Sequence, residues 1–288
     1  MYKALYDICK AEKETGIPFW KLVQQDDCRE RGIDEAQSMA DMRAMYLAMK
    51  ESNENYDASL LSASGLVGTE GAKLQKRREE GKLVCGDFIG SVMEKALRVS
   101  ESNACMKRIV AAPTAGSCGV VPAVFLSIQE REGFDDDKMT EALFVAAGIG
   151  GVIASRAFLS GAAGGCQAEI GSASAMAAGG LAYLLGGDCD TISNAAALAL
   201  KNLLGLACDP VAGLVEVPCV KRNVLGAVNA LTSADLSMAG IISKIPPDEV
   251  FDAMRSIGRN MNEDIRETGK GGLAGTPSGV KIREEISM

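Results

Sequence analysis

The feature that most constrains the fold is the stretch of residues 140–187, which is rich in alanine, glycine, serine and leucine and nearly free of charge. Its apolar runs reach helix length, so a membrane span has to be weighed first. The first run stops at Arg156, the run before Glu169 is short, and the run from Ile170 has small side chains that gain little energy in lipid. We therefore expect closely packed buried helices, because small side chains let backbones approach one another.

Alternating strand patterns are scarce elsewhere, and no repeat of fixed period is present. The sequence therefore predicts an all-α fold, a compact multi-helix domain in which Ala/Gly-rich helices are buried around a site. We expect a single domain over 1–288, with peripheral amphipathic helices in 1–55 and the site-bearing core in 56–288. Asp34 is expected to cap a helix that runs to about Lys50. Further helices are expected at 87–105, 120–129, 193–206, 221–231, 233–243 and 247–261.

The composition limits the classes of partner and of chemistry. A net charge of -8 argues against nucleic acid and against an anionic membrane as partners. The chain has no histidine, which removes the commonest general base and the commonest nitrogen ligand for metals. A proton transfer near neutral pH must then use lysine, cysteine, glutamate, tyrosine or a group from another chain.

The nine cysteines indicate the compartment. Their number is odd, no two form a Cys-x-x-Cys pair, and the charged, amphipathic first residues do not resemble a signal peptide. We expect a reducing cytoplasm, in which the cysteines are thiols or metal ligands rather than disulfides.

Three of these cysteines stand in unusual surroundings. Cys208 and Cys219 lie near prolines in the stretch 206–222, and Cys166 begins an Ala/Gly-rich helix, so we interpret the three as one constellation. Three thiolates can hold a [4Fe–4S] cluster and leave one iron without a protein ligand, whereas structural zinc takes four ligands in closely spaced pairs. The spacing alone leaves open that they are small buried hydrophobes, which is how we interpret Cys9, Cys28, Cys85, Cys105, Cys118 and Cys189.

Three further segments could contribute to a site. Glu169 is a carboxylate in an apolar run just after Cys166, and it either pairs with Arg156, which we favour, or acts on a substrate. The turn 113–119 offers free amides at the start of a helix, which suit a carboxylate or phosphate, unless it is an ordinary connection. The loop 60–71 lets backbone amides approach a ligand, although a plain surface loop has the same composition. The candidate binding residues in the two loops are Ser62, Ser64, Gly65, Thr114, Gly116 and Ser117.

Four motifs carry a resemblance to a known family: APTAGSCGVVPAV, GGCQAEIGSASAMAAGGLAYLLGG, CDPVAGLVEVPCVKRN and ETGKGGLAGTP. Together they resemble the iron–sulfur L-serine dehydratase family, and nearly the whole chain is similar to the separate alpha subunit of its two-chain form. The resemblance implies an all-helical catalytic domain with a [4Fe–4S] cluster as cofactor, held by Cys166, Cys208 and Cys219. It also implies that L-serine is deaminated to pyruvate and ammonia without pyridoxal phosphate, in amino-acid catabolism and gluconeogenesis.

The sequence departs from the family in one respect that bears on mechanism. Many relatives carry a histidine just before a Leu-Gly-Leu, where this chain has the run KNLLGL at 201–206. The base must therefore come from elsewhere, and we expect a beta subunit to supply the missing histidine. The turn 113–119 and the loop 62–68 are our candidates for holding the carboxylate and the ammonium of L-serine.

Two rival functions stay open. A related iron–sulfur lyase on the same scaffold, such as a cysteine desulfidase or another small hydroxy-acid dehydratase, differs in its pocket by only about 1–3 kcal/mol. A non-catalytic helical scaffold that binds a partner chain through its small-residue surfaces requires no cluster at all. Turnover of serine, threonine and cysteine, together with iron and sulfide analysis, separates these functions.

Overall fold

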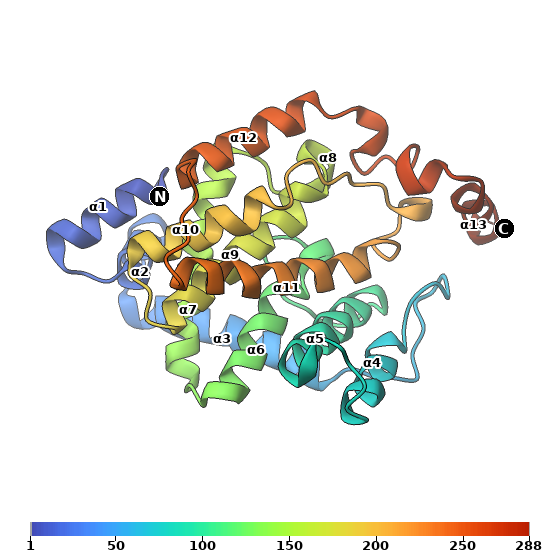
Figure 1. Ribbon diagram of the computed structural model, residues 1–288, viewed down its shortest axis with the longest axis horizontal. Coiled ribbons are helices and arrows are strands. Elements are labelled where there is room, and N and C mark those ends of the chain that lie inside the picture. The colour runs from blue at the N-terminus through green and yellow to red at the C-terminus, as the bar shows by residue number, and fades with distance from the viewer. Residues whose placement is uncertain (1, 288) are drawn as a thin grey trace.

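The computed structural model describes residues 2–287, and within that range the chain forms helices and connecting loops but no β-strand (Figure 1). The predicted all-α fold is therefore confirmed. The helices are α1 (Leu5–Thr15), α2 (Phe19–Arg31), α3 (Glu35–Glu54), α4 (Glu70–Glu79), α5 (Gly86–Ala104), α6 (Val120–Glu132), α7 (Asp136–Arg156), α8 (Gly161–Gly164), α9 (Ser172–Leu184), α10 (Cys189–Lys201), α11 (Cys219–Met238), α12 (Pro247–Asn260) and α13 (Pro277–Ser287).

Helix α9 is the centre of the molecule, in contact with α6, α7, α10 and α11 (Figure 1). All of its residues except Tyr183 are buried. A β-carbon added at Gly179 would collide with Ile149, and one added at Gly180 would collide with Phe125. The small residues of the sequence thus let neighbouring helices approach α9 more closely than larger side chains would allow.

Helix α7 is the one helix among residues 2–287 that is long and apolar enough to cross a membrane by length and composition alone. It packs against α9 on one side and against α2 and α3 on another. About 61% of its most apolar window is buried inside the protein. The stretch that suggested a membrane span is therefore a core helix within this fold, as the small residues around it predicted.

The three N-terminal helices lie against the same core. Side chains from all of them, among them Leu5, Phe19 and Tyr46, are almost fully buried in one hydrophobic cluster with residues of α9. Asp34 begins α3 as predicted, because its side chain accepts a hydrogen bond from the Gln37 amide at 2.8 Å. The division of the chain at residue 55 stays a prediction.

Helix boundaries differ from the predicted ones in two places. The segments 221–231 and 233–243 form one helix, α11, that runs to Met238, because nothing between them breaks the helix. Helix α10 spans Cys189–Lys201 rather than 193–206. The Asp188 side chain accepts a hydrogen bond from the Thr191 amide at 2.8 Å and caps the helix at its start, and the chain turns after Lys201.

One pair of cysteines corrects the expectation that none is oxidised. Cys9 on α1 and Cys189 at the start of α10 form a disulfide. Packing of α1 against α10 brings together two residues far apart in the sequence, which their spacing could not reveal. The interpretation of the other cysteines as buried hydrophobes holds for Cys118 but not for the half-buried Cys28 and Cys105 or the exposed Cys85.

Candidate functional site

The three predicted ligands come from separate segments that meet beside α9. Cys166 directly precedes the π-helical segment Gln167–Gly171 that leads into α9, Cys208 lies in the connection after α10, and Cys219 is the first residue of α11. All three are buried, with exposed fractions of 3%, 2% and 8%. Burial raises the pKa of Cys208, and charge on the other two cysteines raises it further. The three sulfurs therefore lie near enough to one another for a charge on one to change the pKa of another.

The surroundings of the thiols favour their neutral form. Burial raises the pKa of Cys166 to about 11 and that of Cys219 to about 12, while the Arg222 guanidinium opposes the rise at both. These pKa values keep the thiols protonated at neutral pH. A metal centre, which binds thiolates, would displace their protons on binding.

The donor set consists of three cysteine sulfurs. Within residues 2–287, no group of three or more histidine, cysteine, aspartate or glutamate side chains is arranged to hold a metal ion. A [4Fe–4S] cube binds its cysteines at separate corners, so it needs them farther apart than the ligands of one ion. A β-carbon added at Gly161 would lie 2.7 Å from the Cys208 sulfur and 2.8 Å from Glu169 Oε2. Three sulfur ligands beside Gly161 are of the type that an iron–sulfur cluster binds.

Glu169 lies between the cysteines and Thr114. Its Oε1 accepts a hydrogen bond from Thr114 Oγ1 at 2.7 Å, and its Oε2 accepts one from the Cys208 thiol at 3.7 Å. Burial raises the pKa of Glu169, and the hydrogen bond from Thr114 opposes that rise. The favoured pairing with Arg156 is wrong, because the end of α7 lies beside α12, where Arg156 binds Asp252 at 2.5 Å.

The π-helical segment that carries Glu169 is anchored by its first residue. Gln167 is fully buried. Its side-chain Nε2 donates to the Met254 carbonyl at 3.2 Å, and its Oε1 accepts a hydrogen bond from the backbone amide of Gly205 at 2.9 Å. These bonds tie the segment to α12 and to the connection that leads to Cys208. Single π-helical turns are rare and occur often at functional sites.

The turn 113–119 closes the site on another side. Beyond the Thr114 bond, a β-carbon added at Gly116 would lie 3.1 Å from Glu169 Oε1. Asn223 donates to the carbonyl of Gly116 at 2.8 Å and to that of Cys219 at 3.0 Å, which joins the turn to α11. Ser117 is buried and forms a capping box with Thr114. The structure thus places this candidate binding turn next to Glu169 and Cys219.

The second candidate loop lies against the segment that joins Cys208 to Cys219. Ser62 Oγ donates to Glu216 Oε2 at 2.8 Å, and Ser64 Oγ donates to the same oxygen. Gly65 has a φ of +74°, and a β-carbon there would meet nothing within 4 Å. The hydroxyls therefore face a buried carboxylate rather than the sulfurs.

Three polar residues around the cysteines escaped sequence reasoning: Glu216, Arg222 and Asn223. The guanidinium of Arg222 donates to the Ala207 carbonyl at 2.6 Å and to Asp209 Oδ1 at 2.8 Å, on either side of Cys208. Glu216 and Arg222 are each one helical turn from Cys219 in sequence. Charged side chains three residues from a cysteine in an otherwise apolar motif could have indicated Glu216 and Arg222 from the sequence.

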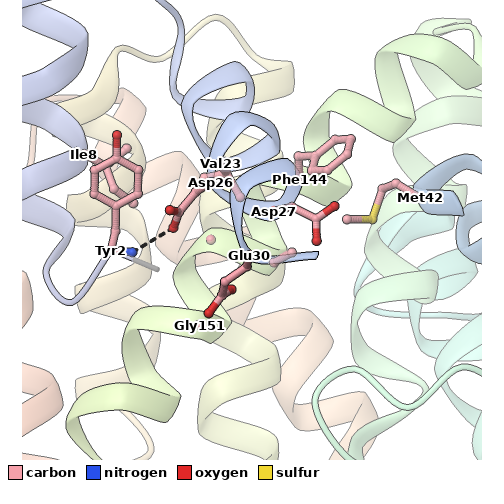
Figure 2. A pocket seen from close by; sticks show the side chains of 11 residues that line it. Tyr2, Ile8, Val23, Asp26, Asp27, Glu30, Met42, Phe144 and Gly151 are labelled. Carbon is pink, nitrogen blue, oxygen red and sulfur yellow. Dashed lines mark hydrogen bonds between the residues drawn. The ribbon is translucent and has the colours of Figure 1, made fainter. Parts of the chain in front are cut away.

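A separate small cavity, of about 120 Å³, lies among α2, α3 and α7 (Figure 2). Tyr2, Asp26, Asp27 and Met42 are among its lining residues. Asp26 accepts a hydrogen bond from the Tyr2 amide at 2.8 Å, and Asp27 accepts one from Ser38 Oγ at 2.6 Å. None of the predicted site residues lines this cavity.

Comparison with known proteins identifies relatives along nearly the whole chain. A profile of the family described as serine dehydratase alpha chain matches residues 14–274. The chain is 44% identical over 286 residues to the probable L-serine dehydratase alpha chain of Bacillus subtilis, a match that covers 99% of this chain and 94% of the relative. It is 40% identical over 285 residues to the L-serine dehydratase alpha chain of Peptoniphilus asaccharolyticus, with 99% and 97% covered.

A third relative differs in length. The L-serine dehydratase of Helicobacter pylori is 40% identical over 249 residues, which cover 82% of this chain but 54% of that protein. The two alpha chains are thus matched almost end to end, whereas this longer relative is matched over about half.

Proposed function

Since this chain belongs to the serine dehydratase alpha chain family, we propose that it is the alpha subunit of an L-serine dehydratase, which converts L-serine to pyruvate and ammonia. The observation that carries the proposal is the convergence of three buried thiols, from three segments, beside the carboxylate of Glu169. We place the enzyme in the cytoplasm, where Cys166, Cys208 and Cys219 stay reduced, although the disulfide Cys9–Cys189 is unusual for a reducing compartment.

Cys166, Cys208 and Cys219 would hold a [4Fe–4S] cluster. When bound, such a cluster supplies a Lewis-acidic iron that helps the substrate hydroxyl to depart. The thiols themselves are almost inaccessible to water.

Glu169 is our candidate for proton handling within this chain. Its Oε2 accepts a hydrogen bond from the Cys208 thiol and its Oε1 accepts one from Thr114 Oγ1. These two bonds hold the carboxyl group in place at the site. Burial, which raises its pKa, makes it a better proton acceptor than an exposed glutamate. The role of Glu169 is to hold or accept a proton at Oε2, with a histidine of the partner chain as the alternative base.

The two loops would divide the charged ends of L-serine between them. We assign the carboxylate to the turn that holds Thr114, Gly116 and Ser117, because this turn lies directly beside Glu169. Ser62, Ser64 and Gly65 lie on the side of Glu216, whose buried carboxylate would attract the ammonium group.

A beta subunit would complete the enzyme. The chain contains no histidine, and it matches only about half of the longer relative from Helicobacter pylori. A second chain that corresponds to the unmatched half would supply the missing histidine. Full serine turnover by the reconstituted alpha chain alone would refute this shared site.

The decisive experiment is anaerobic iron and sulfide analysis combined with serine turnover by the alpha–beta complex. We expect the wild type to contain iron and sulfide, and Cys208→Ala to lose both together with roughly a thousandfold or more of the activity. Cys28→Ala is the control, because Cys28 is a half-buried free cysteine on α2, outside the constellation and outside both candidate binding loops.

The rival functions predict different results. Faster turnover of cysteine, with release of sulfide, would favour a desulfidase. A wild-type protein without iron, whose assembly Cys208→Ala leaves unchanged, would favour a non-catalytic scaffold. Zinc in place of iron and sulfide would indicate a structural site.

A further inference from the structure

One side chain, Arg222, joins two of the segments that carry the cysteines and lies close to the third. It lies one helical turn after Cys219 on α11. Its guanidinium donates to the Ala207 carbonyl at 2.6 Å and to Asp209 Oδ1 at 2.8 Å, so it holds the chain on both sides of Cys208. Its positive charge also lies close enough to Cys166 to lower the pKa of that thiol.

The network continues from Asp209 into the glycine-rich segment near the end of the chain. Asp209 Oδ2 accepts a hydrogen bond from the Leu273 amide at 2.8 Å. Gly272 has a φ of +58°, and a β-carbon there would lie 2.6 Å from that of Asp209. The close approach of this segment therefore fixes Asp209, which in turn fixes Arg222.

The ion pair between Arg222 and Asp209 is well shielded from water, with side-chain exposures of 15% and 8%. Removing two charges from water costs several kcal/mol each, and their attraction offsets this only with good geometry. Well-packed apolar side chains would serve the stability of a fold at least as well. A half-buried arginine whose two hydrogen bonds both go to the neighbours of Cys208 indicates a role at the sulfurs.

We propose that Arg222 is a positioning residue that holds the three cysteines in register and offsets the negative charge that gathers when they bind a metal centre. The inference rests on the proposed function, in which these cysteines hold an iron–sulfur cluster. The neighbouring carboxylates add to that charge, since both Glu169 and Glu267 raise the pKa of Cys208. A guanidinium in a fixed fork supplies the opposite charge and the orientation together.

The test compares three variants of the full-length chain. Arg222→Gln removes the charge and the fork, whereas Arg222→Lys keeps the charge and loses the fork. Arg156→Gln is the matched control, because Arg156 also donates to one backbone carbonyl, that of Lys3, and to one carboxylate, that of Asp252. That arginine lies at the end of α7, and neither of its partners is in a cysteine-bearing segment.

The first readout is the reactivity of the cysteines in the metal-free chain, measured under anaerobic conditions by mass spectrometry of peptides labelled with a thiol reagent. We expect Arg222→Gln to label Cys166, Cys208 and Cys219 about tenfold faster than the wild type, because the loss of the buried bonds that order their segments outweighs the smaller thiolate fraction left without the positive charge. Arg222→Lys should fall between the two. Arg156→Gln should label these three cysteines at the wild-type rate even if its melting temperature falls.

The second readout is the iron and sulfide content after anaerobic reconstitution, together with the reduction potential of the reconstituted centre. We expect Arg222→Gln to retain less iron than the wild type and to have a more negative potential, because a nearby positive charge favours the reduced form. Arg222→Lys should restore the potential more fully than the iron content. A residue with only a structural role would not shift the potential.

Two results would overturn the proposal: unchanged labelling of the three cysteines in Arg222→Gln, or the same acceleration in Arg156→Gln. Failure of the proposed function looks different, because the wild type itself would then take up no iron and sulfide. In that case the labelling experiment still decides whether Arg222 orders the three cysteines.

Discussion

The Ala/Gly-rich core and the cysteine-bearing end of this protein are both buried, but different interactions specify them. Around α9 the helices are held by the sizes of their side chains, as the collisions expected at Gly179 and Gly180 show. Around the cysteines, segments without regular structure are held by directed hydrogen bonds from Arg222 and Asn223. Close packing tolerates few changes of volume, whereas a polar network tolerates few changes of chemistry.

Helix α11 belongs to both regions and shows the transition within a few turns. Its first turns contain Cys219, Arg222 and Asn223, which face the site. Further along, Gly226 packs against the core, where an added β-carbon would lie 2.8 Å from Ile170 Cγ2 and 3.0 Å from Val120 Cγ2. A single rigid helix therefore connects the core to the site.

The largest expected effect separates chemistry from packing at the site. If Glu169 handles the proton, Glu169→Gln should lower kcat for serine roughly 10²–10⁴-fold, because the amide keeps the shape but cannot accept a proton. Iron and sulfide content should stay at the wild-type level. Steady-state kinetics of the alpha–beta complex measures this. Glu141→Gln, a half-buried glutamate on α7 that accepts from Tyr183, is the control and should stay near wild type. A loss of less than threefold would remove Glu169 from the mechanism.

The next effect tests whether the site depends on polar bonds. Asn223→Ala leaves the Gly119 amide and the carbonyls of Gly116 and Cys219 without their partner, which should cost about 2–4 kcal/mol of unfolding free energy. Urea unfolding measures the loss, and thiol labelling should show faster reaction of Cys219.

Asn229→Ala on the same helix is the matched control for that variant. Asn229 bonds to Ser174 and to the Ala199 carbonyl within the core. It should lose stability but leave the reactivity of Cys219 unchanged. If Cys219 were labelled equally faster in both variants, the core and the cysteine-bearing end would unfold together. The two regions would then not be distinct in stability.

A smaller effect tests packing in the core. Gly180→Val should destabilise the protein by about 1–3 kcal/mol, because the added carbons have no space beside Phe125. Thermal unfolding measures the change, and the iron content of the folded protein should not alter. Ala40→Val adds bulk at an exposed position of α3 and should cost only about 0.5 kcal/mol. If both substitutions lowered the unfolding free energy equally, the close approach of neighbouring helices would not be what limits side-chain size on α9.

The smallest effect concerns the helix cap that begins α10. Hydrogen bonds from Thr191 hold the pKa of Asp188 below its usual value of 3.8. A lowered carboxyl pKa stabilises the fold above the unfolded pKa, and this contribution is lost as the pH falls through the folded pKa. Asp188→Ala should therefore cost about 1 kcal/mol at pH 7, with a difference from wild type that shrinks in acid. A difference independent of pH, or Asp188→Asn behaving like Asp188→Ala, would contradict this.

Local signals account for most of what could be predicted. Scarce strand patterns and a long stretch of small residues predicted the all-helical fold, and Asp34 marked the start of α3 correctly. The family motifs singled out Cys166, Cys208 and Cys219, which the fold brings together, although their role as ligands remains a prediction. The pairing of Glu169 with Arg156 failed, because the direction in which a side chain leaves a helix depends on which helices pack around it.

The sequence by itself determined the helical class, the closeness of packing around α9 and the chemical types present at the site, since each depends on neighbours along the chain or on composition. Only the tertiary structure decided the pairs that join distant residues: Cys9 with Cys189, Arg156 with Asp252, Ser62 with Glu216 and Arg222 with the segment around Cys208. Such pairs form where packed helices and loops meet, and their geometry is set by the whole core at once rather than by spacing in the chain.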